Sequence, residues 1–320
     1  MDWIETTVAE ICTETPLIRS LRLKRPHGEP LPAWEPGAHV RIALPDGDDR
    51  PYSLVNLSDE PGATARPTHY RLGVRLEEPT RGGSRYVHDL AAGQTVRITP
   101  PSNDFVLEPT RAAVALVAGG IGVTPIASMA ARLVAAGDPF RLHYLVRSEA
   151  QAAFRDELAA LAGDRLALHR DDRDGVFDLA GLMRGLGADE PLYLCGPTPL
   201  IEAAITLAAE LGWAPSRLHF EVFAPAAPKA CDGAFEVELR ATGQTLTVPA
   251  DRTILDAMIE AGLDPLYDCK RGDCGICQAT VLEGLPDHRD FILSESEREA
   301  GGLIQICVSR SKTPRLVLDL

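Results

Sequence analysis

The chain has 320 residues and a formal net charge of −14 at pH 7. That length exceeds what one hydrophobic core usually organises, which predicts roughly two or three domains. The acidic charge argues against nucleic-acid binding, which needs Lys and Arg side chains against phosphates. No apolar run approaches the roughly 20 residues of a membrane-spanning helix, and residues 1–5 lack the features of a secretory signal. We therefore expect a cytoplasmic protein without a membrane span.

Residues 1–108 are predicted to form an antiparallel β domain. Short stretches in which apolar and polar residues alternate, such as residues 39–44 and 70–75, are separated by Pro, Gly and Asp turns. A small barrel or sandwich accommodates this pattern.

A different pattern begins near residue 111. The apolar strand 112–118 runs into a glycine turn, a helix over 126–135 follows, and residues 140–146 form the next strand. Further elements are expected as helix 151–162, strand 166–169, strand 191–195 and helix 200–212. This alternation predicts a parallel sheet covered by helices on both faces.

The Pro- and Ala-rich stretch 224–230 has no amphipathic period and is the best candidate for an interdomain linker. After it, residues 235–239 and 245–248 alternate as the strands of a hairpin, and a short helix is expected over 253–260. Residues 231–320 hold sixteen acidic against nine basic side chains. Such an excess either guides docking to a basic partner or is merely a solvated acidic face.

Four cysteines have the spacing of a plant-type [2Fe-2S] centre. Cys269, Cys274 and Cys277 form C-x4-C-x2-C, and Cys307 follows after 29 intervening residues. Two irons bridged by two sulfides need four thiolates, and Gly272 and Gly275 allow the tight loop that brings three of them together. Zinc is the alternative, but structural zinc sites usually pair two short Cys knuckles and this sequence has one Cys-x2-Cys. The other three cysteines, Cys12, Cys195 and Cys231, are best interpreted as ordinary thiols.

Two motifs in the β domain suit a phosphorylated, planar ligand. The sequence Arg-Pro-Tyr-Ser at 50–53 offers a guanidinium, a phenol and a hydroxyl, and Arg-Gly-Gly-Ser at 81–84 offers backbone N–H groups and the Ser84 hydroxyl. Either motif alone is equally well explained as an ordinary turn.

A third glycine motif, at residues 119–125, follows a buried strand and opens a helix. A pyrophosphate can meet backbone donors and a positive helix end at such a place. The motif departs from G-x-G-x-x-G, so a ligand-free turn is the alternative. The sequence Cys-Gly-Pro at 195–197 ends a later strand of the same sheet, where open α/β sheets bind ligands.

Taken in chain order, these motifs closely resemble the phthalate dioxygenase reductase family, which includes the vanillate O-demethylase reductases and belongs to the ferredoxin–NADP reductase superfamily. The resemblance spans nearly the whole chain and also covers Glu-Val-Phe at 221–223. It implies an FMN-binding antiparallel β-barrel domain over 1–108 and an α/β parallel-sheet NAD domain over 109–223. A linker at 224–230 would then lead to a β-grasp α+β ferredoxin domain over 231–320.

The resemblance also implies roles for individual residues. The residues expected to contact the flavin and its phosphate are Arg50, Tyr52, Ser53, Gly83 and Ser84. The nicotinamide and pyrophosphate path would be lined by Gly119, Gly120, Gly122, Thr124, Pro125, Cys195, Gly196 and Pro197. Phe223 would cover the flavin face with Glu221 beside it, and these two residues together with Thr124 are the expected catalytic positions. Without the resemblance, Phe223 is simply a core aromatic.

FMN is favoured over FAD because residues 101–105 look like the FMN-binding branch of the superfamily. NADH is favoured over NADPH by resemblance, although Arg147, after strand 140–146, could pair with a 2′-phosphate. A nicotinamide transfers two electrons as a hydride, whereas a [2Fe-2S] cluster accepts one electron at a time. The flavin is therefore expected to act between them. This chemistry requires no general acid or base.

The expected partner is a separate terminal oxygenase of the Rieske non-haem iron type acting on an aromatic compound, with a cytochrome P450 as the runner-up. Two other readings remain open. The first is a free flavin reductase with a structural or redox-sensing C-terminal module, and the second is a zinc-stapled binding protein without catalysis.

Overall fold

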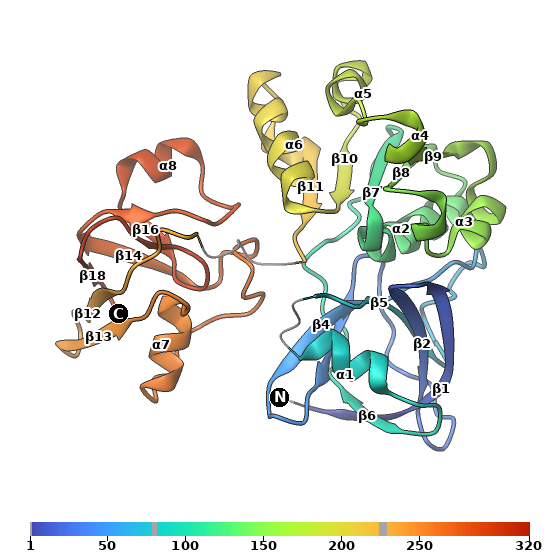
Figure 1. Ribbon diagram of the computed structural model, residues 1–320. Helices are drawn as coiled ribbons and strands as arrows, with labels where there is room; N and C mark the ends of the chain where they lie inside the picture. The colour runs from blue at the N-terminus through green and yellow to red at the C-terminus, as the bar shows by residue number, and fades with distance from the viewer. Residues whose placement is uncertain (1, 79–81, 224–228) are drawn as a thin grey trace. The chain divides into compact units, whose positions relative to one another are not determined.

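Figure 1 shows the computed structural model of the chain, which describes residues 2–78, 82–223 and 229–320. It contains two compact units, Met1–Glu221 and Val222–Leu320. The predicted multidomain architecture is confirmed, because the first unit holds an antiparallel and a parallel sheet and the second an α+β fold. Arg81 and residues 224–228 of the predicted linker lie outside the described residues.

Within the described ranges, no helix combines the length and the apolar character needed to cross a bilayer.

The N-terminal sheet is antiparallel and closes on itself. Its order is β4-β3-β6-β1-β2-β5, and an antiparallel bridge between Leu54, just after β4, and Leu72 in β5 joins the two edge strands. Alternating residues turn inward, so that Leu23, Val40 and Ile98 are fully buried. The predicted barrel is therefore confirmed. Its elements are β1 (Ile4–Thr15), β2 (Ile18–Lys24), β3 (His39–Ala43), β4 (Asp49–Ser53), β5 (Tyr70–Arg75), α1 (Gly83–Asp89) and β6 (Thr95–Ile98).

The second sheet is parallel, in the order β11-β10-β7-β8-β9, with helices on either side as the alternation predicts. Its strands are β7 (Val114–Gly119), β8 (Phe140–Val146), β9 (Leu166–Arg170), β10 (Leu192–Cys195) and β11 (Leu218–Glu221). Its helices are α2 (Val123–Ala136), α3 (Arg155–Ala162), α4 (Asp171–Asp174), α5 (Leu179–Gly185) and α6 (Thr198–Glu210), with 3-10 turns η1 (Gly120–Gly122), η2 (Glu149–Gln151), η3 (Gly163–Arg165) and η4 (Pro215–Arg217).

Several helix boundaries beside this sheet differ from the predicted ones, and the largest error is at the start of α3. The helix expected over 151–162 begins only at Arg155, because η2 and then Phe154, which has a left-handed φ of 58°, interrupt it. A left-handed residue cannot continue an α-helix. The strand over 140–146 has the bounds that the sequence predicts.

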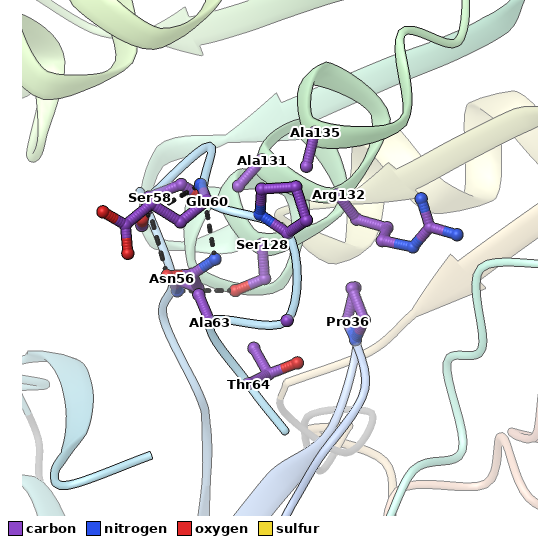
Figure 2. A pocket seen from close by; sticks show the side chains of 12 residues that line it. Pro36, Asn56, Ser58, Glu60, Ala63, Thr64, Ser128, Ala131, Arg132 and Ala135 are labelled. Carbon is purple, nitrogen blue, oxygen red and sulfur yellow. Dashed lines mark hydrogen bonds between the residues drawn. The ribbon is translucent and has the colours of Figure 1, made fainter. Parts of the chain in front are cut away.

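Ser128 on α2 ties the barrel to the parallel sheet. Its hydroxyl donates to the carbonyl of Leu54 and accepts from the backbone N–H of Asn56, both at 2.8 Å, so the segment after β4 is fixed to α2. Figure 2 shows the pocket beside this joint, about 350 Å³ in volume, between the loop from Asn56 to Thr64 and the side of α2 that bears Arg132. Together these contacts hold the flavin-type and nucleotide-type motifs in one unit.

The second unit is a mixed five-stranded sheet in the order β13-β12-β18-β14-β16, with β12 and β18 parallel. Helix α7 begins with a capping box in which Thr253 and Asp256 exchange side-chain and backbone hydrogen bonds. Its buried residues Ile254, Leu255 and Met258 join the core. Its elements are β12 (Phe235–Leu239), β13 (Gln244–Val248), α7 (Ile254–Glu260), β14 (Gln278–Glu283), β15 (Pro286–Asp287), α8 (Glu295–Ala300), β16 (Leu303–Gln305), β17 (Arg310–Ser311) and β18 (Arg315–Leu318).

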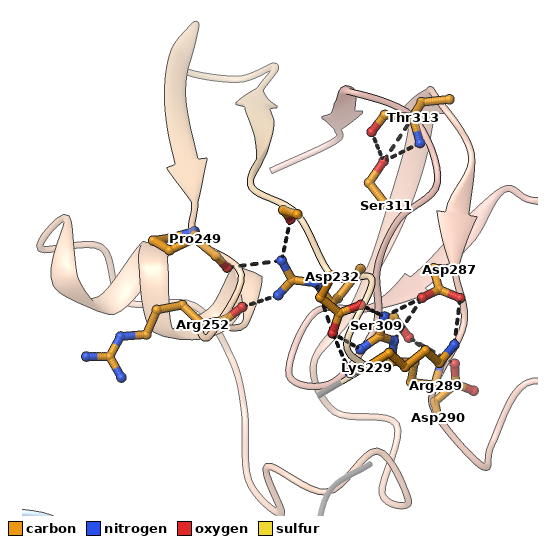
Figure 3. Close-up of polar contacts among 12 residues, drawn as sticks. Lys229, Asp232, Pro249, Arg252, Asp287, Arg289, Asp290, Ser309, Ser311 and Thr313 are labelled. Atoms are coloured by element: carbon orange, nitrogen blue, oxygen red, sulfur yellow. Dashed lines mark hydrogen bonds and ion pairs between the residues drawn. The ribbon is translucent and has the colours of Figure 1, made fainter. Parts of the chain in front are cut away.

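An ionic network fastens the start of this unit to its later strands, as Figure 3 shows. Arg289 donates hydrogen bonds from both terminal nitrogens to the Asp232 carboxylate, with Nη1 lying 2.7 Å from Oδ2. Arg289 also pairs with Asp287 at the end of β15. The Asp232 and Arg289 side chains are each 6% exposed. Hydrogen bonds from Arg289 lower the pKa of Asp232 to about 2.

Candidate functional site

The expected flavin residues of β4 meet the start of α1. Arg50 and Tyr52 lie on β4, and Gly83 begins α1 so close to them that a Cβ there would stand 2.5 Å from Cγ of Arg50 and 3.3 Å from the phenol oxygen of Tyr52. Burial raises the pKa of the Tyr52 phenol. A guanidinium, glycine backbone and a neutral phenol therefore lie together, which is a donor set that suits a phosphorylated ring cofactor.

Three of the predicted flavin residues, Ser84, Arg50 and Ser53, have neighbours inside the protein. The Ser84 hydroxyl accepts from the backbone N–H of Glu77 at 3.2 Å. Arg50 pairs with the carboxylate of Asp48 at 2.5 Å. Ser53 is 5% exposed and stands opposite His39 of β3. The roles of these residues toward a flavin remain predictions.

The segment over 101–105, which favoured FMN at the sequence level, is engaged in internal contacts. The Ser102 hydroxyl lies 3.0 Å from Nε2 of His39, and the Asn103 amide donates to the carbonyl of Pro36. Gly37 makes this packing possible, because a Cβ there would lie 1.9 Å from the carbonyl oxygen of Phe105. These contacts explain the motif by packing and do not distinguish FMN from FAD.

The carboxyl ends of three neighbouring strands bring the nucleotide motifs together. Cys195 at the end of β10 stands in register with Ala118 of β7 on one side and Glu221 of β11 on the other. Cys195 is fully buried and Glu221 is 4% exposed. Both glycine motifs and the Glu-Val-Phe segment therefore start from the same edge of the sheet, which is where ligands bind in open α/β folds.

The two glycine turns at this edge interlock through their backbones. A Cβ at Gly122 would lie 2.1 Å from the carbonyl oxygen of Cys195, and one at Gly119 would lie 2.6 Å from Cδ of Pro197 and 3.1 Å from Cα of Gly196. Gly120 differs, because it has a φ of 55° and faces open space. Its half-buried backbone is therefore a candidate contact for a ligand at this turn.

Thr124 and Pro125 lie in the first turn of α2 and are both buried. The Thr124 hydroxyl donates to the carbonyl of Ile121 at 3.0 Å, and its methyl group packs against Gly73 of β5. Thr124 thus joins the nucleotide turn to the barrel. A catalytic role for Thr124 remains a prediction, as it does for Glu221 and for the half-buried Phe223.

A charged cluster that the sequence analysis missed lies after β8 and β9. Glu149, three residues beyond β8, is approached by Arg155 at 2.7 Å and by Arg170 and Arg173 at 3.7 Å each. Arg147, the predicted partner of a 2′-phosphate, is exposed, and its guanidinium has no ion pair within the described ranges. The only sequence signal for this cluster is the number of residues between the glycine turn and Glu149.

The four predicted metal ligands converge in the second unit. Cys269, Cys277 and Cys307 are each at most 5% exposed. Hydrogen bonds from the Cys274 and Cys307 thiols hold the pKa of Cys269 far below its ordinary value, and Cys307 also bonds Cys277. Four sulfurs linked through Cys269 and Cys307 in this way are the donor set of a [2Fe-2S] centre. Among the described residues, no group of three or more His, Cys, Asp or Glu side chains is already positioned around a metal site. The fit to a [2Fe-2S] centre therefore rests on the chemistry of the four cysteine sulfurs.

The cysteine loop takes its shape from three left-handed positions, at Lys270, Gly272 and Gly275. A Cβ at Gly272 would stand 2.7 Å from Cγ2 of Val308, so the loop packs tightly against the segment that carries Cys307. The N–H of Arg271 donates to the Cys269 sulfur at 3.3 Å. Backbone donors of this kind stabilise negative charge on sulfur ligands.

Asp273 within this loop is a second feature that the sequence analysis missed. Its carboxylate accepts from the backbone N–H of Val222 at 3.2 Å, which ties the loop to the residue before Phe223. Burial, together with the nearby Cys269 sulfur, raises the pKa of Asp273 to about 7. Nothing in the sequence pattern around residue 273 predicts a contact with residue 222.

Comparisons with known proteins agree with this geometry. Residues 237–312 match the model of the 2Fe-2S iron-sulfur cluster binding domain, a stretch that contains all four cysteines. The chain is 42% identical to tetrachlorobenzoquinone reductase of Sphingobium chlorophenolicum, over 99% of this chain and 98% of that protein. It is also 42% identical to a vanillate O-demethylase oxidoreductase from a Pseudomonas strain, over 95% of each.

The solved structure of phthalate dioxygenase reductase superposes on the chain with a TM-score of 0.76 and 34% sequence identity, covering 99% of this chain and 98% of that one. The chain belongs to the phthalate dioxygenase reductase family. As a phthalate dioxygenase reductase-type protein, it is an oxidoreductase with a C-terminal [2Fe-2S] domain, and flavin and pyridine nucleotide are the cofactors of its fold family.

Members of this fold also occur inside longer proteins. An intact type IV self-sufficient cytochrome P450 monooxygenase matches the phthalate dioxygenase reductase-type chain with a TM-score of 0.73 and 34% identity. The match covers 99% of this chain but 41% of that protein. The family fold is therefore found both as a protein of this length and as part of a larger one.

Proposed function

We propose that this chain is the reductase component of an oxygenase system, which takes electrons from NADH through FMN to its [2Fe-2S] centre and passes them to a separate terminal oxygenase. The observation that carries this proposal is the presence of three binding regions in one chain. These are the Arg50–Tyr52–Gly83 group, the glycine-lined strand edge and the four converging cysteines.

The chemistry belongs to the bound groups: a nicotinamide gives two electrons as a hydride, a [2Fe-2S] centre accepts one, and a flavin handles both. The protein's own residues bind and orient. Arg50 would neutralise the flavin phosphate, and Gly83 leaves room for it. The backbone at Gly120 would face the nucleotide, and Arg271 N–H stabilises the charge on Cys269.

Three finer points belong to this proposal. FMN is proposed because residues 101–105 look like the FMN-binding branch of the superfamily, with Arg50 as the candidate contact to its phosphate. NADH is proposed on the family likeness. We also propose domain bounds of 1–108, 109–223 and 231–320, which fall between β6 and β7 and before β12.

A Rieske-type oxygenase acting on an aromatic compound is the proposed partner, supported by the likeness to a phthalate dioxygenase reductase and to a vanillate O-demethylase oxidoreductase. A cytochrome P450 is the second candidate, supported by the self-sufficient P450 whose reductase portion this chain resembles.

An anaerobic visible spectrum of the purified protein, titrated with NADH, tests the proposal. We expect flavin absorption on a broad iron–sulfur envelope, both bleaching on addition of NADH, and release of FMN on denaturation. A colourless protein with full zinc occupancy would overturn it. Stopped-flow reduction of a purified Rieske oxygenase and of a P450 then separates the two partner classes by rate.

A further inference from the structure

The carboxyl edge of β8 and β9 carries a charge arrangement that bears on which pyridine nucleotide enters. In dinucleotide-binding sheets, the strand after the first glycine turn ends beside the adenosine ribose. A carboxylate there bonds the 2′-hydroxyl of NAD, whereas an arginine accommodates the 2′-phosphate of NADP. Here β8 is that strand, and Glu149 stands 27 residues beyond Gly122.

Three guanidinium groups already converge on the Glu149 carboxylate. Arg155 Nη1 lies 2.7 Å from Oε1, and Nη1 of Arg170 and of Arg173 each lie 3.7 Å from Oε2. These arginines come from different elements, since Arg155 begins α3, Arg170 ends β9 and Arg173 lies in the last turn of the short helix α4. The side chains are partly exposed, Glu149 by 41% and Arg170 by 27%, so the cluster is open to a ligand.

Neighbouring carboxylates also hold the arginines. Arg155 bonds Asp156 at 2.8 Å, and Arg170 bonds Asp174 at 3.3 Å. His169 lies 3.9 Å from Asp171 on the same edge. A 2′-phosphate carries a charge close to −2. To bind here, the 2′-phosphate would have to displace the Glu149 carboxylate from the three arginines with which it pairs. It would also lie close to the negative charge of Glu149, which repels it.

We propose that Glu149 is a specificity-determining residue that excludes nucleotides with a 2′-phosphate, and that without its charge the Arg155, Arg170 and Arg173 cluster would bind them. This inference rests on the proposed pyridine-nucleotide function and deepens it, because it names the class of nucleotide and the residue that selects it. Arg147, two residues before Glu149, would favour a 2′-phosphate, so the proposal requires the Glu149 carboxylate to outweigh it.

The test is calorimetric binding of 5′-AMP and of 2′,5′-ADP to the full-length holoprotein, which differ only by the 2′-phosphate. The wild type is expected to bind 2′,5′-ADP no more tightly than 5′-AMP. Glu149→Gln is expected to bind 2′,5′-ADP about tenfold more tightly than the wild type does, which corresponds to about 1.4 kcal/mol. Arg170→Gln added to Glu149→Gln is expected to abolish most of that gain.

Asp156→Asn is the matched control. It removes one negative charge that also bonds Arg155, yet the Asp156 side chain is 84% exposed and lies on α3. An equal gain in Asp156→Asn would show a general charge effect and overturn the proposal. So would a wild type that prefers 2′,5′-ADP, or a Glu149→Gln variant without a gain. If the wild type binds neither probe and no NAD⁺, the proposed nucleotide function itself fails. Unchanged flavin and cluster absorption shows that each variant is folded.

Discussion

In the candidate flavin region, the packing of Gly83 against Arg50 leaves no room for even one more atom. Gly83 has no Cβ, and one would stand 2.5 Å from the Arg50 side chain. No real Cβ contact is that short, so either Arg50 or the start of α1 would have to move. The position of Arg50, and with it the proposed phosphate-binding point, therefore depends on the absence of a Cβ at residue 83.

If FMN binds as proposed, Gly83→Ala is expected to weaken its binding about tenfold, because Arg50 would be displaced from the proposed phosphate position. Flavin fluorescence during titration of the deflavinated protein measures the dissociation constant. Gly185→Ala is the control, since a Cβ at Gly185 meets nothing within 4 Å. Equal affinity in Gly83→Ala and the wild type would remove Arg50 and Gly83 from the flavin site.

Cys274→Ser is expected to abolish reduction of one-electron protein acceptors while reduction of ferricyanide by NADH continues, because the flavin part of the chain is unaffected. Cys231→Ser, an exposed cysteine of the same unit, is the control and keeps both activities. If the Cys274 variant still reduced protein acceptors at the wild-type rate, the C-terminal domain would be a structural or sensing module instead of the exit for electrons.

At the level of helices and strands, the Asp232–Arg289 pair holds the lead-in to β12 against the later strands. The pKa of Asp232 is lowered to about 2 from 3.8. A lowered carboxyl pKa stabilises the fold above the unfolded-state value and loses that contribution as the pH falls from 3.8 toward 2.

Asp232→Asn is expected to lower the free energy of unfolding by about 1–3 kcal/mol, because Arg289 loses a charged partner. Urea unfolding at several pH values from about 5 to 8 is expected to give a constant difference, since that range lies above both values of the pKa. Asp319→Asn, at an exposed position, controls for the loss of one charge. A difference that shrinks between pH 7 and 5 would contradict the low pKa.

The elements that sequence patterns predict well are those whose signal is local. Strands 70–75, 140–146 and 235–239 have the predicted bounds because alternation and flanking turns define them. The four cysteines converge as their spacing predicts. The predicted start of α3 is wrong because Phe154 adopts a left-handed φ, which no local sequence pattern indicates.

What the sequence could not predict depends on contacts between distant segments. Ser128 meets Leu54 across 74 residues, and Asp273 meets Val222 across 51. Three arginines of separate elements converge on Glu149. Each residue is unremarkable in its own window, and only the tertiary fold gives it a partner.

For the molecule as a whole, charge is distributed unevenly along the chain. Residues 231–320 carry sixteen acidic and nine basic side chains, and this stretch contains the four cysteines of the cluster through which we propose that electrons leave. Long-range attraction then favours acceptors with a basic surface and weakens as salt screens it.

The rate constant for reduction of cytochrome c, a basic protein used as the one-electron acceptor, is therefore expected to fall several-fold as NaCl rises from about 0.02 to 0.5 M. Stopped-flow absorbance measures it. Ferricyanide, a small anion, is the control and is expected to show no such fall. A cytochrome c rate that does not change with salt would mean that the acidic excess is only a solvated face.

The distribution of thiols gives the molecule a practical property. Cys12 in the first unit and Cys231 in the second are exposed, whereas the buried Cys195 and the four cluster ligands are protected by packing or by iron. The native sequence thus provides one attachment point for a spectroscopic label in each unit. Paired spin labels at these two positions, read by pulsed electron resonance before and after addition of NADH, would follow the distance between the units during turnover without any engineered cysteine.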